Sequence, residues 1–110
     1  MTASPNTTRP HPQFANFREF YPHYLAQHSN PTSRRLHVSG TLLAVVIGTL
    51  ALLRGRPDWV PFALLAGYLP AWVGHFFFEH NVPATFRHPL YSLRGDFTML
   101  LETLTGRVRW

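Results

Sequence analysis

The stretches LHVSGTLLAVVIGTLALL (36–53) and WVPFALLAGYLPAWVGHFFF (59–78) decide the fold, and the short segment RGRPD (54–58) joins them. Neither stretch contains Asp, Glu, Lys or Arg over its 18 and 20 residues. Such runs have the length that a helix needs to cross about 30 Å of hydrocarbon. The sequence therefore predicts an all-α protein built on a transmembrane two-helix hairpin, with spans at about 36–53 and 59–78.

Small residues along both runs would let the two helices approach closely. They are Gly40, Gly48, Gly67 and Gly74. Pro70 is expected to kink the second helix, which a membrane helix tolerates. A soluble helical hairpin with buried runs stays open as an alternative, because the mean hydropathy of the whole chain is only −0.07.

The charges are unevenly distributed along the chain. All ten basic residues are arginine, five acids oppose them, and cysteine is absent. Eight arginines flank the hairpin on the side of the termini and only Arg54 and Arg56 lie in the turn, so the positive-inside rule predicts cytoplasmic termini. The protein would be integral to the membrane, the inner membrane if it is bacterial. No stripe of basic and stacking residues points to nucleic acid.

The hairpin is flanked by shorter segments. Residues 1–13 read as a disordered tail without a signal peptide, and 14–110 as a single membrane-embedded helical domain. Before the hairpin, a helix at about 22–28 is expected to begin at Pro22. It would lie at the membrane interface or pack on a soluble core. The helical pattern of apolar residues begins before Pro22 and continues through this helix. It consists of Phe17, Phe20, Tyr21, Tyr24, Leu25 and His28.

The segment after the hairpin is predicted to form a loop and then a short final helix. Prolines and Asn81 favour the loop, and Asp96 is expected to be the N-cap of a helix lying on the membrane or on the hairpin. This helix is the second of two flanking interfacial amphipathic helices. Its apolar face would contain Phe97, Leu100, Leu101 and Leu104.

Histidines occur at matching ends of the two runs. His37 and His75 would each lie roughly 27 Å from the turn, at the same depth. His28 precedes His37 by one short turn, and Glu79 follows His75 at helical spacing. Three imidazoles and a carboxylate could thus surround non-haem iron, manganese or zinc. Each His could equally be an interfacial or capping group, and His80 and His88 are reserve ligands.

Two segments resemble motifs of the small membrane-protein family typified by the fungal 2-hydroxy fatty acid dioxygenase. They are FREFYPHYLAQHSNPTSRRLHVSGT (17–41) and GHFFFEHNVPATFRHPLYSLRGDF (74–97). The fungal enzyme is an Fe(II)-dependent protein of the endoplasmic reticulum that shortens 2-hydroxy fatty acids by one carbon. The resemblance implies iron ligands at His28, His37 and His75, with Glu79 at the matching acidic position. Relatives often have a basic residue where this chain has His80.

The predicted function is Fe(II)-dependent dioxygenation of 2-hydroxy fatty acids with O2, by α-oxidation. Arg34, Arg35 and Arg87 could attract the substrate carboxylate, Asn81 belongs to the second motif and is assigned to substrate binding, and an apolar slot would hold the chain. The slot is expected to be lined by Phe76, Phe77, Phe78 and Phe97. Two other functions stay open: a non-enzymatic, lipid-binding structural hairpin, and haem or quinone binding by paired histidines. A lone hairpin also suggests a homo-oligomer.

Overall fold

The computed structural model describes residues 14–110, so the predicted disordered tail at 1–13 lies outside the described residues. The predicted all-α class is confirmed, because residues 14–110 contain helices and no strand. The α-helices are α1 (Phe17–Ala26), α2 (Pro31–Arg54), α3 (Val60–Val73) and α4 (Pro89–Leu104). Short helical segments are the 3₁₀ turns η2 (Pro57–Trp59) and η4 (Ala84–Phe86) and the π-helix η3 (Gly74–Glu79).

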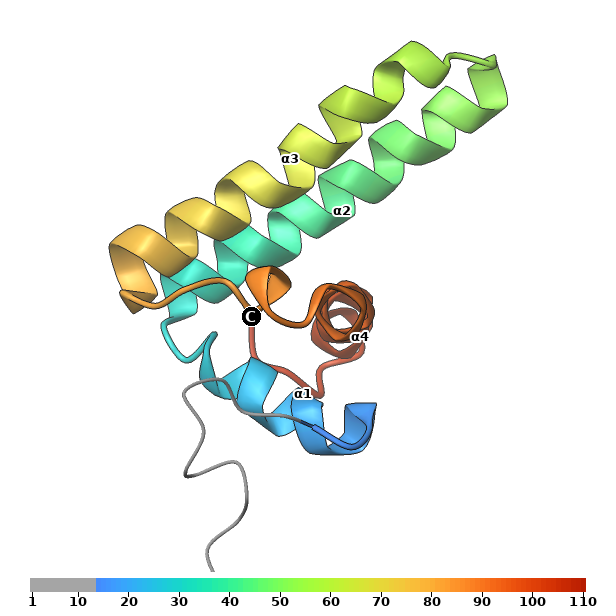
Figure 1. The fold of residues 1–110 in the computed structure, drawn as a ribbon. Helices are drawn as coiled ribbons and strands as arrows, with labels where there is room; N and C mark the ends of the chain where they lie inside the picture. Colours follow the sequence, from blue (N-terminus) through green and yellow to red (C-terminus); the bar gives the residue numbers. More distant parts are fainter. Residues whose placement is uncertain (1–13) are drawn as a thin grey trace, which may run out of the picture.

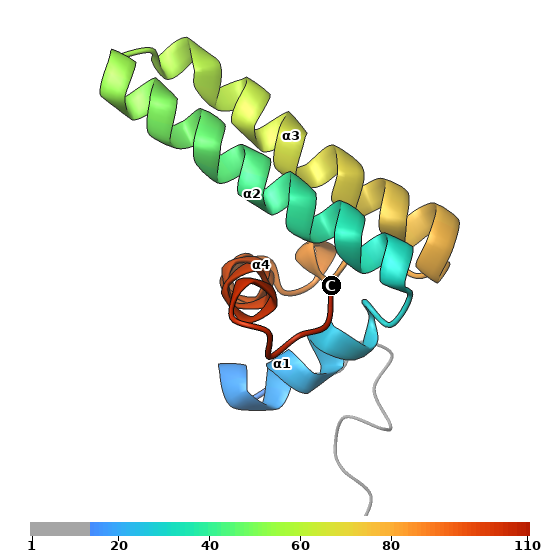
Figure 2. The same cartoon turned by 180° about the vertical axis from the view of Figure 1, so that it is seen from behind.

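Helices α2 and α3 run side by side in opposite directions (Figures 1 and 2). Gly55 ends α2 in the left-handed conformation, with φ 61°, so that the chain can reverse. A Cβ atom on Gly40 would lie 2.8 Å from the backbone oxygen of Ala66, so this glycine permits close contact between the two backbones. Gly48 does not have the expected role, since an added Cβ there would meet nothing within 4 Å.

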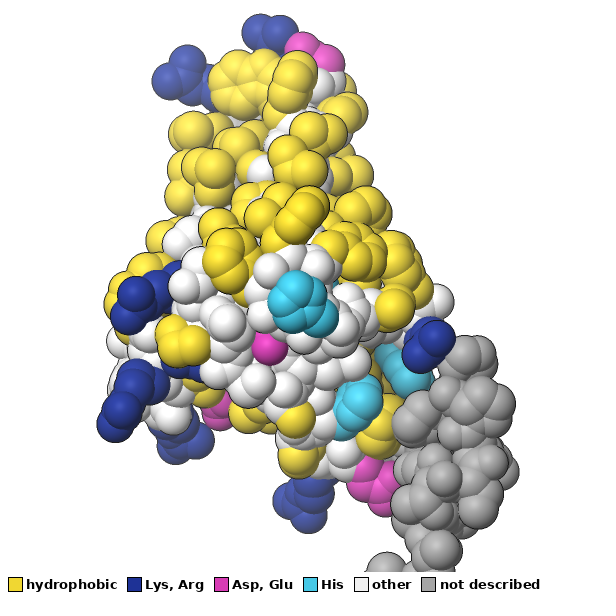
Figure 3. Space-filling view, turned by 90° about the vertical axis from the view of Figure 1, so that its left-hand side faces the viewer, with side chains coloured by type: hydrophobic (Ala, Val, Ile, Leu, Met, Phe, Trp, Pro, Cys, Tyr) yellow, Lys and Arg dark blue, Asp and Glu magenta, His cyan; other side chains and the backbone are white. Residues whose placement is uncertain are grey.

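Most of the hairpin surface is apolar and exposed. Only 28 % and 22 % of the apolar windows of the segments Pro31–Arg54 and Pro57–Glu79 is buried, whereas the core helices of a soluble protein would be mostly buried. Hydrophobic side chains cover the long arm of the molecule, and charged side chains gather at its tip and at its broad end (Figure 3). By length and composition, the two helical segments could cross a membrane.

Helix α1 is longer than the sequence indicated, because it begins at Phe17 and contains Pro22 in its interior. The side chain of Asn16 caps its first turn by accepting a hydrogen bond from the Glu19 N–H, at 2.9 Å. Its aromatic face packs into the protein: Phe20 and Tyr24 are fully buried. This face of α1 is thus packed on protein, and the placement of the helix at the membrane interface stays a prediction.

Helix α4 begins at Pro89, seven residues before the predicted N-cap, and Asp96 lies in its middle. Proline favours the first position of a helix, where its missing N–H has no intrahelical partner. Gly95 faces α1, and a Cβ atom there would lie 3.0 Å from the Tyr24 ring. The outer face of α4 exposes an apolar stripe, formed by Leu90, Leu93, Phe97, Leu101 and Leu104.

Helices α1 and α4 lie at the open end of the hairpin, away from its turn (Figures 1 and 2). Their shared core, which we call the base core, contains Phe20, Tyr24, Val38, Ala84, Met99 and Leu100. The tip of the hairpin has no comparable cluster among the residues that the structure describes. The base core is therefore what positions the residues at the open end.

Candidate metal centre

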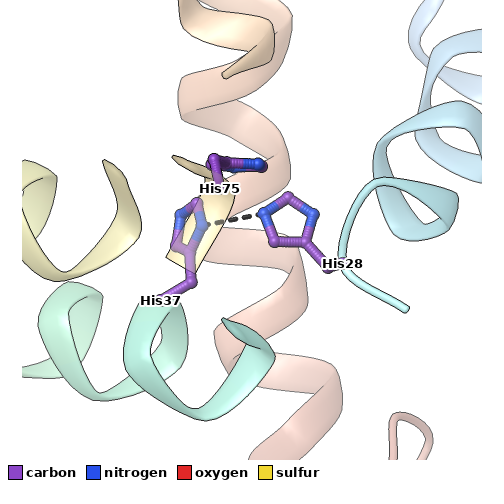
Figure 4. Close-up of side chains that lie close together, drawn as sticks. All are labelled: His28, His37 and His75. Carbon is purple, nitrogen blue, oxygen red and sulfur yellow. Dashed lines mark hydrogen bonds between the residues drawn. The ribbon is translucent and has the colours of Figure 1, made fainter. Parts of the chain in front are cut away.

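Three histidines from three separate segments converge at the open end of the hairpin (Figure 4). His28 follows α1, His37 lies in the second turn of α2, and His75 lies in η3. Their side chains are buried, with exposed fractions of 1 %, 6 % and 2 %. Each offers a ring nitrogen within 4.8 Å of those of the other two, which makes them a candidate group of metal ligands.

The orientation of His28 is fixed by the backbone of α1. Its Nδ1 lies 2.7 Å from the carbonyl oxygen of Tyr24, which can only accept, so Nδ1–H donates. Burial, and then the neighbouring His37, hold the pKa of His28 well below its usual value. The ring is thus neutral near pH 7, and its Nε2 carries a free lone pair.

His37 is oriented by a carboxylate on α4. Its Nε2 lies 2.7 Å from Oδ1 of Asp96, and a carboxylate oxygen accepts, so Nε2–H donates and the lone pair is on Nδ1. The Tyr24 hydroxyl donates to the same oxygen at 2.6 Å. Burial and the charge of Asp96 raise the pKa of Tyr24, which keeps the phenol protonated as a donor. Asp96 and Tyr24 together hold the imidazole in one tautomer.

His75 is oriented by the loop that follows it. Its Nδ1 lies 2.6 Å from Oδ1 of Asn81, and the amide is fixed the right way round because its Nδ2 donates to the Gln27 carbonyl at 3.2 Å. The loop returns to the helix because His80 adopts the left-handed conformation, with φ 58°, and the Asn81 N–H donates to the His75 carbonyl. The free lone pair of His75 is therefore on Nε2.

All three imidazoles thus use one nitrogen as a donor to an oxygen and have the other free. Nε2 of His28 lies 2.8 Å from Nδ1 of His37, so two lone pairs face each other. Such an arrangement is favourable only when a cation, a proton or a metal ion, lies between the nitrogens. Metal-binding histidines in proteins have this outer hydrogen-bond pattern. The donor set fits Fe(II), Mn(II) or Zn(II).

The 2.8 Å between Nε2 of His28 and Nδ1 of His37 leaves no room for a haem iron held between these two nitrogens. The pair that lies across the hairpin is His37 and His75, whose ring centroids are 6.0 Å apart. Haem or quinone binding by that pair stays a prediction. The cavity next to His37 and His75 has a volume of about 10 Å³.

Glu79 does not join the three histidines, which make up the group of close ligand atoms among residues 14–110. Its carboxylate instead accepts from the Asn30 N–H at 2.8 Å and from the Ser29 hydroxyl at 3.3 Å. It therefore stabilises the turn that carries His28, and its predicted catalytic role stays a prediction.

The predicted substrate-binding arginines have different surroundings. Arg34 donates to the carbonyls of His28 and Arg109, and Arg35 donates to the carbonyl of Trp110, so both tie the C-terminal segment to α2. Arg87 is exposed after η4. Their roles in substrate binding, like that of Asn81, stay predictions.

The other histidines among residues 14–110 lie outside the cluster. His80 is exposed and forms the left-handed turn after η3. The ring of His88 packs on Phe14 and Phe20. His23 is half-buried, with its ring 5.1 Å from that of Phe14. The two reserve ligands therefore belong to a turn and to the packing of α1.

Sequence reasoning missed Asp96 and Tyr24 as partners of the site. Asp96 was predicted as an N-cap, and Tyr24 only as part of an apolar face. The available signal was the rarity of acids: Asp96 is one of only five in the chain. The role of Tyr24 on α1 could not be predicted from the sequence, because it depends on the close packing of α4 against Tyr24 at Gly95.

An apolar groove of about 400 Å³ lies between α2, α3 and α4. Its walls include Ala44, Gly48 and Gly67, and Thr41, Tyr68 and Asp96 also line it. The cavity beside His37 and His75 shares Tyr68 and Asp96 with the groove, so the two spaces adjoin. Phe97 lines the groove as predicted, whereas Phe76, Phe77 and Phe78 do not line it and are exposed.

The fold and the site define an all-helical protein with two helical segments that could span a membrane and a buried three-histidine cluster that could hold a metal ion. The chain belongs to the family described as 2-hydroxy-palmitic acid dioxygenase Mpo1-like, whose family model matches residues 14–108. The resemblance read from the two sequence motifs is thereby confirmed. No curated protein and no solved structure matches the chain.

Proposed function

We propose that this protein is an integral membrane dioxygenase that uses Fe(II) and O2 to shorten 2-hydroxy fatty acids by one carbon. The observation that carries the proposal is the set of three buried imidazoles, each held by an outer oxygen partner with its free nitrogen facing the other two. The description of the family supports the same reaction and the class of substrate.

The iron would be held by His28, His37 and His75. Three neutral nitrogen ligands leave positions open, and the bound iron would there supply the means to activate O2 next to the 2-hydroxyl group. The chain's own contribution is orientation. Asp96 and Asn81 keep the outer nitrogens of His37 and His75 protonated, so that the inner nitrogens stay free.

The acyl chain of the substrate would lie in the apolar groove. From Thr41 to Leu52 the groove follows α2 for about 17 Å, which suits a long chain. Thr41, Tyr68 and Asp96 form a polar lining that adjoins the small cavity beside the histidines. The carboxylate end would thus approach the histidines, and Arg34, Arg35 or Arg87 would attract it from the interface.

The hairpin would cross the membrane with both termini in the cytoplasm, at the inner membrane in a bacterium. Its exposed apolar surface and the arginines beyond its open end support this orientation. The apolar stripe of α4 would lie in the interface. The partners would be the lipid substrate, O2 and the membrane, without nucleic acid. A second copy of the chain could cover part of the exposed hairpin, as a homo-oligomer.

A second candidate function is lipid binding without chemistry. The observation that favours it is the open apolar groove, which could hold an acyl chain whether or not a metal is present. This function predicts that substitution of the histidines leaves lipid binding intact and that the purified protein has no stoichiometric metal.

Metal analysis of anaerobically purified protein separates the two functions. We expect about one iron per chain in the wild type and its loss in both His37→Ala and His75→Ala, because each substitution removes one of three ligands. His80→Asn is the matched control: it changes a histidine outside the cluster and suits the left-handed conformation there. O2 uptake with 2-hydroxypalmitic acid should follow the iron content. A wild type that binds no metal even after Fe(II) reconstitution would rule out the dioxygenase.

A further inference from the structure

The small cavity beside the histidines has two polar groups that no part of the described structure satisfies. The Ser92 hydroxyl, on a residue only 1 % exposed, and the Trp72 indole nitrogen are both buried without a hydrogen-bond partner. Both residues line the cavity that His37 and His75 also line. Buried polar groups without partners are uncommon, because each has lost its hydrogen bonds to water and gained none in the protein.

The positions of these two groups are well defined. Trp72 packs its ring against those of Tyr68 and Phe86, at centroid distances of 5.8 and 5.4 Å. Ser92 lies on the buried face of α4, one turn before Asp96. The cavity volume of about 10 Å³ corresponds to a single oxygen-sized group.

The chemistry of the two groups limits what can fill the cavity. An indole N–H only donates, so the ligand atom must accept; a serine hydroxyl can donate or accept. A hydroxyl group satisfies both, because its oxygen can accept from the indole while its hydrogen is donated to Ser92. A carboxylate has no hydrogen to donate and is larger than the space.

We infer that this cavity binds the 2-hydroxyl group of the substrate, and that Ser92 and Trp72 are specificity-determining residues that distinguish 2-hydroxy acids from unhydroxylated acids. The inference rests on the proposed function and extends it to substrate choice. The groove and the cavity share Tyr68 and Asp96, so an acyl chain in the groove brings the second carbon to the cavity.

The experiment measures the affinities for 2-hydroxypalmitic acid and palmitic acid by calorimetry in detergent. Fe(II)-loaded protein is used without O2, so that no turnover occurs. Ser92→Ala should weaken binding of the hydroxy acid about fivefold, the effect of one hydrogen bond, and leave palmitic acid unchanged. Trp72→Phe should also weaken binding of the hydroxy acid and leave palmitic acid unchanged. This variant provides the test if Ser92→Ala does not fold.

Two matched controls are available. Ser33→Ala removes another buried, unpartnered hydroxyl that does not line the cavity, and Trp59→Phe changes a tryptophan near the turn at the tip. Both should keep the preference for the hydroxy acid. If Ser92→Ala and Trp72→Phe leave the ratio of the two affinities unchanged, the inference is overturned while the proposed function stands. A wild type that binds neither acid overturns both.

Discussion

Two regions of this molecule differ in how their side chains are buried: the base, where α1 and α4 pack on the open end of the hairpin, and the tip, around the turn between α2 and α3. At the base, Phe20, Tyr24 and Met99 are at most 1 % exposed, and every imidazole of the cluster has a partner. At the tip, Leu52 and Phe62 are 82 % and 66 % exposed. The base therefore gains its stability from internal packing, whereas the tip must find apolar contacts outside the chain, as helices in a bilayer do.

The core of the base gives the strongest test of this comparison. Met99→Ala should destabilise the folded base by about 2–5 kcal/mol, because it leaves a cavity among rigid aromatic rings. Thermal unfolding followed by near-ultraviolet circular dichroism in detergent would measure it. Leu52→Ala, at the exposed tip, is the control and should change the melting temperature little. Equal losses in the two variants would mean that the tip has a packed core of its own.

The tip can be tested through the membrane. Leu65 is 60 % exposed and lies near the middle of the second apolar segment. The substitution Leu65→Arg would place a charge in the hydrocarbon, at a cost of about 2.5–3.5 kcal/mol for membrane insertion. Resistance to alkaline extraction from membranes should fall. Leu53→Arg, beside the existing Arg54 at the end of the span, should be tolerated. Full membrane retention of the Leu65→Arg protein would contradict the placement of the hairpin across the bilayer.

The smallest expected effect concerns the carboxylate that orients His37. Asp96→Ala should weaken metal binding about 10–100-fold, because it removes the acceptor that holds the imidazole tautomer, and the three ligands stay in place. Competition with a chelator would measure the affinity. Asp58→Asn is the control, since this acid pairs with Arg56 at the tip. An unchanged affinity in Asp96→Ala would show that packing alone orients the ring.

Local patterns in the sequence predicted the helices reliably where the apolar character of a long run was the main determinant. The two uncharged runs were sufficient to predict long helices, but α2 begins at Pro31 and has 24 residues where 18 were predicted, and the second segment has 23 where 20 were predicted. Local patterns failed at Pro22 and Asp96. The sequence predicts a helix start at Pro22, but the Asn16 cap and the packing of Phe20 and Tyr24 outweigh the lost hydrogen bond. The sequence predicts Asp96 as an N-cap, because local patterns do not show its hydrogen-bond partner His37, which is 59 residues away.

The spacing of the histidines was informative for a simple reason. Helices rise by a fixed distance per residue, so the positions of His37 and His75 relative to the turn predicted their common level. The π-helix η3 was not predictable, and neither was the hydrogen bond from the Asn30 N–H to the Glu79 carboxylate. The Glu79 carboxylate, which was predicted to lie among the three histidines, is therefore hydrogen-bonded to the turn that carries His28.

The all-α class, the two long apolar helices and the common level of His37 and His75 could be predicted from composition and regular helical geometry, and the family from the two sequence motifs. Which nitrogen of each imidazole is free, and which oxygen fixes it, depended on the three-dimensional packing. This packing also decided that Ser92 and Trp72 share a cavity with the cluster. Such pairings join residues distant in the chain, and they follow from how α1 and α4 pack against the hairpin rather than from any local pattern.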